Sequence, residues 1–292
     1  MVAGDLPFWT SMFLGLLQGS TELFPVSSLG HAVLLPSLLH LDFRQSDESF
    51  VPYLVLLHLG TAAALVVIYR REWVALIAAF ARAAVRGELR DADERLVMML
   101  AIGTVPAGVA GVVFETRLKS LFATPRPAAI FLVCNAGILL GAEMLRRRSE
   151  RRAALEGRSR EEQELAFASV DRLSFRSAIL VGACQALALL PGISRSGVTM
   201  AGGLLAGLRH EEAVRFSFLL ATPIIAAAGA LEVPQLFNSG VPVGQYALGA
   251  VLAGLAAYAS ARFLIRYFRV GRLDPYAYYC ATLGLIGLIV VR

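Results

Sequence analysis

Long apolar runs separated by short polar connections dominate the pattern along the chain. A helix needs about 20 apolar residues to cross the hydrocarbon core of a bilayer, and six runs come close to that length. These predicted spans are residues 51–69, 96–114, 127–145, 214–231, 244–263 and 275–291. The pattern therefore predicts an all-α polytopic membrane protein with six transmembrane helices.

Two further apolar regions, residues 8–40 and 174–208, are interrupted in the middle by Pro, Gly and Ser. The halves are mostly too short to span a bilayer. Non-helical backbone at membrane depth is tolerated only where protein or a water-filled cavity satisfies its polar groups. We therefore predict that each region is a re-entrant helix-loop-helix segment.

The basic residues are distributed unevenly among the connections. Placing the Arg-rich connections in the cytoplasm makes the spans alternate correctly, because basic loops are retained on that side. The Arg-rich connections are residues 70–95, 146–176 and 262–272, and the poor ones are residues 40–50, 115–126 and 232–243. The first re-entrant segment then enters from the outer side and the second from the cytoplasmic side.

Each re-entrant segment is followed by three spans, so a repeated unit must be inverted relative to the first. We predict one integral membrane domain, residues 1–292, with halves at about 1–145 and 174–292 joined by an Arg-rich cytoplasmic segment, 146–173. A gap-free alignment of residues 15–30 with 182–197 supports the duplication. It matches Gly15 with Gly182, Gln18 with Gln185, Leu23 with Leu190, Ser27 with Ser194 and Gly30 with Gly197.

Composition narrows the function classes. Hydrophobic residues make up 57% of the chain and charged residues 17%, with a net charge of +5. Topology and contact with anionic membrane lipids account for the arginines, so a nucleic-acid partner is not needed. The three cysteines are scattered in apolar contexts and form no disulfide or metal pattern.

Polar residues gather at the two breaks, which in an inverted repeat meet near the bilayer midplane. The first break carries Glu22, Ser27, Ser28 and His31, and the second carries Ser194, Arg195, Ser196, Gly197 and Thr199. A guanidinium at membrane depth costs at least a few kcal/mol and needs an interior partner. Arg195 either pairs with Glu22 as a purely structural lock or binds an anion, and the surrounding hydroxyls and glycines favour the anion site.

Glu22 and His31 form an acid and imidazole pair that could orient and deprotonate the Ser28 hydroxyl. Gln18 lies four residues before Glu22, hence on the same helix face, where it would bind either substrate or Glu22. The remaining polar residues are excluded from the predicted site. His40, His58 and His210 lie at or near span ends, and Asn135 is interpreted as an interhelical contact.

The segments QGSTELFPVSSLGH and PGISRSGVT resemble the bacterial undecaprenyl-diphosphate phosphatase family, also called bacitracin-resistance proteins. The family pattern is (E/Q)xxxE, here Gln18 to Glu22, then PVSSxGH at 25–31 and PGxSRSG at 191–197, and the resemblance covers essentially the whole chain. Two positions depart from many members: Gln18 stands where they have Glu, and Leu29 where they have Thr. The first departure puts metal binding by paired carboxylates in doubt.

The resemblance implies hydrolysis of undecaprenyl diphosphate to undecaprenyl phosphate and inorganic phosphate, which regenerates the lipid carrier of cell-wall synthesis. It also implies an inverted-repeat fold and a homodimer in the bacterial plasma (inner) membrane, with the site open to the outer, periplasmic face. The family's key catalytic positions are then occupied by Glu22, Ser28, His31 and Arg195, with Ser27 and Ser194 beside them.

The mechanism that we predict from the sequence is attack of Ser28 on the terminal phosphorus, with His31 as the base oriented by Glu22. The residues predicted to bind the substrate are Gln18, Ser27, Ser194, Ser196, Gly197 and Thr199. A Mg²⁺ or Ca²⁺ ion could shield the diphosphate, although the sequence contains no recognisable metal cage. The alternatives are a transporter of polyprenyl phosphate, and an acid-phosphatase type that is disfavoured because it needs two histidines in the site.

Overall fold

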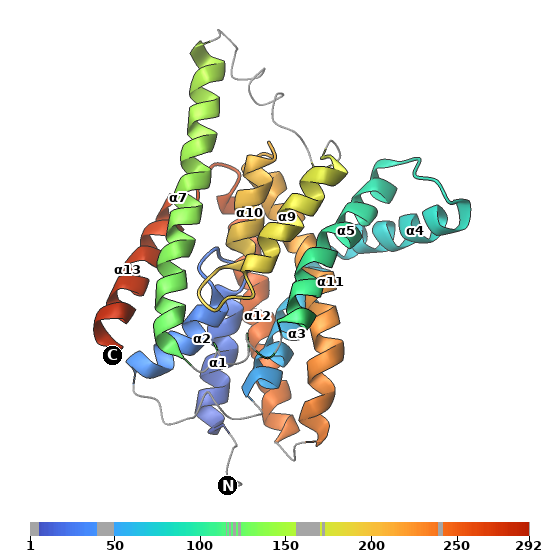
Figure 1. Ribbon diagram of the computed structural model, residues 1–292. Coiled ribbons are helices and arrows are strands. Elements are labelled where there is room, and N and C mark those ends of the chain that lie inside the picture. The colour runs from blue at the N-terminus through green and yellow to red at the C-terminus, as the bar shows by residue number, and fades with distance from the viewer. Residues whose placement is uncertain are drawn as a thin grey trace.

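The structure, a computed structural model, describes residues 6–39, 50–114, 116, 118, 121, 124–155, 170, 173–238 and 242–291. Within these residues the chain forms helices and no β-strand, as Figure 1 shows. Five stretches are long and apolar enough to cross a membrane: Phe50–Ile68 in α3, Ala92–Val113 in α5, Pro125–Arg152 in α7, His210–Pro234 in α11 and Val243–Tyr267 in α12. These five match predicted spans and confirm a polytopic, all-α membrane protein.

The sixth predicted span corresponds to α13 (Asp274–Val290), which has 17 residues. At 1.5 Å per residue this helix is about 26 Å long, a little less than the hydrocarbon core of about 30 Å. It packs along α7 (Pro125–Leu155). Close packing is possible because Gly284 faces the backbone of α7 at Ala129 and Val133.

Both broken regions form pairs of short helices. They are α1 (Phe8–Thr21) with α2 (Ser28–Leu38), and α9 (Phe175–Leu187) with α10 (Arg195–Leu205). In Figure 1 the first pair occupies one half of the molecule and the second pair the other half, with the two loops between them in the middle. The longest of the four has 14 residues, which is too short to cross a bilayer.

The two pairs contact the longer helices in the same way. Gly15 of α1 lies against the backbone of Gly249 on α12 (Val243–Tyr267), and a Cβ built at Gly15 would overlap that carbonyl oxygen. Gly182 of α9 lies against Gly103 on α5 (Ala92–Val113) with the same overlap. Small residues let helix backbones approach closely in membranes, which explains both contacts. The recurrence agrees with the alignment of Gly15 and Gly182.

One helix lies outside the predicted pattern. Residues 70–86, predicted only as part of an Arg-rich connection, form α4 (Arg70–Arg86), which projects sideways in Figure 1. It buries Leu76, Ala79 and Ala83 and ends at Gly87, whose φ of 71° suits a helix C-terminus. Hydropathy missed α4 because only one face is apolar.

The Arg-rich connections meet at one end of the molecule. Arg147 on α7 pairs with Asp274, and Arg272 pairs with Glu143 at 2.9 Å. Arg215, near the start of α11 (His210–Asn238), pairs with Glu72 of α4 at 2.6 Å. Arg269 lies near Glu211 at the start of α11, so the described parts of all three connections are on one side, as the charge pattern predicts. The connection at 40–49, with His40, and most of residues 115–123 and 156–169 lie outside the described residues.

Candidate active site

The first break is shaped by Ser27, the N-cap of α2. Its Oγ accepts the Gly30 N–H at 3.1 Å, which satisfies one of the free donors at the helix start. Ser27 has a φ of 66°, a conformation that costs energy for a residue with a side chain. The His31 Nδ1–H, 2.7 Å from the Ser27 carbonyl, stabilises this turn.

The second break repeats the cap and contacts the first. Ser194, the N-cap of α10, accepts the Gly197 N–H at 3.1 Å, as Ser27 does for Gly30. Gly192 has a φ of 108°, which favours glycine, and donates its N–H to the Ser27 Oγ at 3.2 Å. The two loops are therefore hydrogen-bonded to each other.

Asn135 on α7 joins the two breaks. Its Nδ2 donates to the Pro25 carbonyl at 3.1 Å, and its Oδ1 accepts the Ser194 N–H at 3.0 Å. It is fully buried. The prediction that Asn135 is a general interhelical contact was incomplete, because one side chain holds both loops of the site in register.

Three predicted substrate ligands have internal partners instead. The Ser196 Oγ donates to the Phe24 carbonyl at 2.9 Å, and the Gly197 N–H is taken by Ser194. The Thr199 Oγ1 lies 2.5 Å from the Ser217 Oγ of α11. In this structure these groups stabilise the second break, and their role as substrate ligands stays a prediction. Ser194 lines the cavity described below, although its hydroxyl also bonds Phe24 at 3.3 Å.

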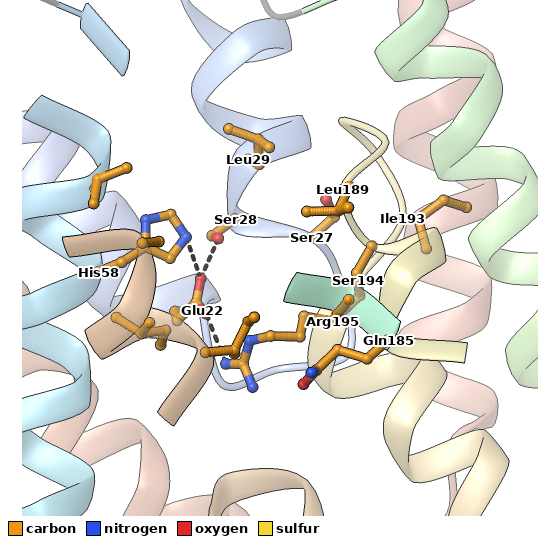
Figure 2. Close-up of a pocket in the computed structure, with 16 residues that line it drawn as sticks. Glu22, Ser27, Ser28, Leu29, His58, Gln185, Leu189, Ile193, Ser194 and Arg195 are labelled. Carbon is orange, nitrogen blue, oxygen red and sulfur yellow. Dashed lines mark hydrogen bonds and ion pairs between the residues drawn. The ribbon is translucent and has the colours of Figure 1, made fainter. Parts of the chain in front are cut away.

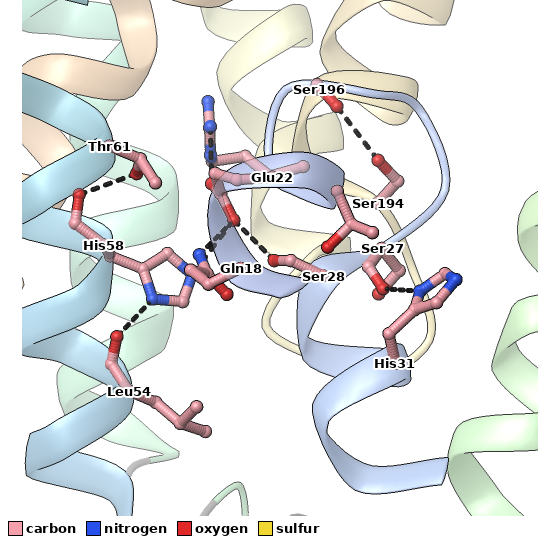
Figure 3. A network of polar contacts seen from close by, with 12 residues as sticks. Gln18, Glu22, Ser27, Ser28, His31, Leu54, His58, Thr61, Ser194 and Ser196 are labelled. Carbon is pink, nitrogen blue, oxygen red and sulfur yellow. Dashed lines mark hydrogen bonds and ion pairs between the residues drawn. The ribbon is translucent and has the colours of Figure 1, made fainter. Parts of the chain in front are cut away.

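Glu22 is the centre of the polar network in Figure 3. Its Oε2 accepts the Ser28 hydroxyl at 2.5 Å and the Gln18 amide at 2.8 Å. Its Oε1 accepts Arg195 Nη2 at 2.7 Å, from the other break. Gln18 therefore holds Glu22 through its Nε2, while its Oε1 has no partner, and a contact of Gln18 with substrate stays a prediction. The predicted meeting of Glu22, Ser28 and Arg195 is confirmed.

The imidazole beside Glu22 belongs to His58 of α3, which the sequence analysis excluded. His58 Nε2 lies 3.1 Å from Glu22 Oε2, and its Nδ1 lies 2.7 Å from the Leu54 carbonyl. A carbonyl only accepts, so Nδ1 carries a proton, and a second proton must lie between Nε2 and Oε2. The position of His58 near the middle of a long apolar helix was a signal that it faces the protein interior.

His31 does not contact Glu22 in this arrangement. Its Nδ1 is bonded to Ser27, and its Nε2 lies 2.7 Å from the Tyr279 hydroxyl of α13. The ring also stacks on Tyr279, with ring centroids 5.6 Å apart. Figure 3 shows Ser27 and Ser28 between His31 and Glu22. The predicted orientation of His31 by Glu22 is therefore corrected: both ring nitrogens have other partners.

A cavity of about 180 Å³ lies between the breaks (Figure 2). Most of its wall is apolar and comes from the spanning helices α3, α5 and α11, from Leu29 of α2 and from the second break. The polar lining comes from both breaks and from α3 and α9: Glu22, Ser27, Ser28, His58, Gln185, Ser194 and Arg195. Such a mixture of apolar walls and a few convergent polar groups is typical of a ligand site.

The cavity does not fit a resident Mg²⁺ or Ca²⁺ ion. These cations take several oxygen ligands. Glu22 is the only carboxylate among the lining residues, and a guanidinium already binds it. No group of three or more His, Cys, Asp or Glu side chains in the described part of the chain could hold a metal ion.

Fold and site together define a multi-pass membrane protein with a buried cavity that is lined by a hydroxyl, a carboxylate and a guanidinium. The chain belongs to the bacitracin resistance protein BacA family, whose model matches residues 11–286. This confirms the family that the motifs indicate.

Named relatives cover nearly the whole chain. It is 43% identical to undecaprenyl-diphosphatase 2 of Chromobacterium violaceum, over 96% of this chain and 97% of the relative. It is 42% identical to undecaprenyl-diphosphatase of Mycobacterium avium, over 99% and 98%. The undecaprenyl-diphosphatase of Acidiphilium cryptum is also 42% identical, over 96% and 97%.

Proposed function

We infer that this protein is an undecaprenyl-diphosphatase, which hydrolyses undecaprenyl diphosphate to undecaprenyl phosphate and inorganic phosphate. One structural observation is the main support for this inference. The Ser28 hydroxyl is bonded to Glu22, and the same carboxylate holds Arg195 at the edge of a cavity with apolar walls. A hydroxyl, a base and a fixed cation are what phosphoryl transfer requires. The names of the full-length relatives agree with this chemistry.

The geometry supports a serine nucleophile activated by Glu22. Ser28 Oγ forms a bond to the terminal phosphorus while the bond from this phosphorus to the bridging oxygen breaks, and the electron pair leaves with the lipid phosphate. The Ser28 proton passes to Glu22 Oε2, 2.5 Å away. Water then attacks the phosphorus of the phosphoserine as its bond to Ser28 Oγ breaks. Glu22 returns its proton to Ser28 Oγ, and the protons of the water leave on the released inorganic phosphate. Arg195 stabilises the charge on the transferred group.

The two imidazoles position this machinery. His58 holds Glu22 Oε2 and places a proton beside the cavity. His31 fixes the carbonyl of Ser27, the residue before the nucleophile. The resemblance to the family implies a catalytic role for His31. In this geometry we propose instead that His31 stabilises the conformation of the loop and is not the base of Ser28.

Phosphate release from purified protein in detergent tests the function against the transporter alternative, because no transport is possible there. We expect the wild type to release phosphate and Arg195→Ala to be inactive. Arg195→Lys should recover little activity, because lysine cannot hold Glu22 and phosphate through one planar fork. A wild-type protein that binds polyprenyl phosphates in detergent but releases no phosphate would favour transport. The names of the relatives favour the phosphatase.

We also propose the finer topology: six spans, two re-entrant segments and inverted repeats. The shared Ser-Gly caps and the paired contacts of Gly15 and Gly182 support it. The Arg-rich end would face the cytoplasm of the bacterial inner membrane by the positive-inside rule, with the site reached from the periplasmic side. A homodimer is proposed from the family resemblance.

No step of this mechanism runs through a metal ion. We propose that any Mg²⁺ or Ca²⁺ ion enters with the substrate and is held mainly by its diphosphate oxygens. The measurement is phosphate release with and without chelator. If a cation only accompanies the substrate, the chelator effect should be overcome by raising the substrate concentration.

A further inference from the structure

One buried side chain in the cavity has no role in the mechanism above. Gln185 on α9 is only 2% exposed and lines the cavity. Neither its Nε2 nor its Oε1 has a hydrogen-bond partner. Buried amides are almost always hydrogen-bonded, since leaving one unpaired costs free energy. Two unpaired atoms on one cavity-lining amide therefore indicate a ligand.

The equivalent residue of the first half shows why this amide is free. Gln18, which aligns with Gln185, donates to Glu22 at 2.8 Å. The residue that aligns with Glu22 in the second half is Leu189, which offers no acceptor. The amide donor is therefore used internally in Gln18, whose Oε1 alone has no partner, whereas both amide atoms of Gln185 are left available.

Arg195 has a free donor on the same side. Its Nη2 binds Glu22, whereas its Nη1 is buried without a partner. Gln185 and Arg195 both line the cavity, and in Figure 2 they lie on one side of the Glu22 carboxylate, with Ser28 on the other side. One amide N–H and one guanidinium N–H are thus available on the side of the cavity away from the nucleophile.

The position of Ser28 indicates which phosphate of the substrate would lie near Gln185 and Arg195. In phosphoryl transfer the nucleophile and the leaving group lie roughly in line on opposite sides of the phosphorus. With Ser28 at the terminal phosphorus, the leaving lipid phosphate points away from Ser28, toward Gln185. We propose that Gln185 Nε2 and Arg195 Nη1 form the subsite for the phosphate that stays on the lipid, which is the leaving group of the reaction. This inference rests on the proposed function.

A binding experiment tests the subsite without requiring catalysis. The two product types, farnesyl phosphate as a lipid monophosphate and inorganic phosphate, are titrated separately onto full-length protein in detergent. Gln185→Leu keeps similar volume and removes both amide atoms. We expect it to weaken farnesyl phosphate binding about tenfold or more, as for a lost hydrogen bond to a charged group, and to leave inorganic phosphate within about twofold.

Two further variants complete the design. Gln245→Leu, at a glutamine that bonds Leu6 and Ser11 outside the cavity, is the matched control and should leave both affinities unchanged. Gln185→Glu should weaken farnesyl phosphate more than Gln185→Leu, because it adds a like charge. Equal affinities in wild type and Gln185→Leu, or a greater loss for inorganic phosphate, would overturn the subsite.

Failure of the proposed function gives a different result. If the wild type releases no phosphate from polyprenyl diphosphate while farnesyl phosphate binding still depends on Gln185, the subsite stands and the hydrolytic function fails. If the wild type is active and Gln185→Leu binds farnesyl phosphate normally, the function stands and the subsite is wrong.

Discussion

The two breaks share a backbone and differ in chemistry. In each, a serine caps the short helix and a glycine follows three residues later, with the same 3.1 Å hydrogen bond. Ser28 and Arg195 occupy the same position, the first residue of α2 and of α10. Glu22, however, aligns with Leu189. In the proposed mechanism, one loop therefore supplies the nucleophile and its base, and the other supplies the cation.

This difference suggests how a duplicated scaffold acquires an asymmetric site. In the proposed inverted repeat, the hydrogen bonds that fix the loop are needed in both halves, and both halves have them. Phosphoryl transfer needs a hydroxyl with a base on one side of the phosphate and positive charge on another. Two identical loops would place two nucleophiles or two guanidiniums face to face, and neither arrangement would meet that need.

The largest expected effect comes from the first break. Ser28→Ala removes the attacking oxygen, and we expect phosphate release to fall at least about a thousandfold. Radiolabelled phosphate from the substrate should be trapped on Ser28 in the wild type after rapid acid quenching. Full activity in Ser28→Ala would show that an activated water attacks directly, and the two breaks would then differ less than proposed.

The second-largest effect is expected at His58 of α3, the imidazole beside Glu22. His58→Leu removes a hydrogen bond to Glu22, so kcat should fall about 10- to 100-fold with little change in KM. His58→Gln should recover much of the activity, because its amide can still donate to Glu22. The control is His210→Leu, at a histidine that pairs with Glu143 away from the cavity and should leave kcat unchanged. Equal losses in His58→Leu and His58→Gln would contradict a positioning role.

The link between the breaks is tested at Asn135. Asn135→Ala leaves the Ser194 N–H unpaired and the Pro25 carbonyl with only the Cys280 thiol as a donor. We expect a loss of about 1–3 kcal/mol in stability together with lower activity. Asn135→Asp keeps the acceptor for Ser194 but loses the donor to Pro25. Thermal unfolding in detergent should place Asn135→Asp between the wild type and Asn135→Ala. An Asn135→Ala protein with unchanged stability would mean that the loops hold together without it.

The smallest effects concern the scaffold. Gly15→Ala and Gly182→Ala each force a Cβ against the backbone of a neighbouring helix, and we expect similar losses of about 1–3 kcal/mol. Gly137→Ala on α7, where nothing lies within 4 Å of the added Cβ, is the matched control. Thermal unfolding measures all three. A loss at only one of the two contact glycines would argue against equivalent halves.

The sequence predicts the scaffold better than the contacts within it. Runs of apolar residues locate the long helices, and the Pro, Gly and Ser interruptions locate the breaks, because membrane burial imposes strong constraints on both. The pairing of Glu22 with Arg195 was predictable as well, since a buried guanidinium needs a partner. The order of the motifs along the chain does not determine the direction in which a side chain points.

That limit explains the two histidines. His31 lies in the motif and close to Ser28 in sequence, yet its ring turns to Ser27 and Tyr279. His58 lies outside both motifs, and packing of α3 beside the first break brings it to Glu22. Only helix packing decides between them, and hydrophobic periodicity is weak in α3 because the helix is apolar on nearly every side.

The bond between His31 and Tyr279 joins residues 248 positions apart. Ribosomes make proteins from the N-terminus, so the ring of His31 enters the membrane long before its α13 partner has been synthesised. The turn at Ser27 therefore lacks one of its supports throughout most of translation. We therefore expect the loop that carries Ser28 to reach its final order only after α13 has been inserted, so that an incompletely inserted chain would be less able to act on the cell's lipid carrier.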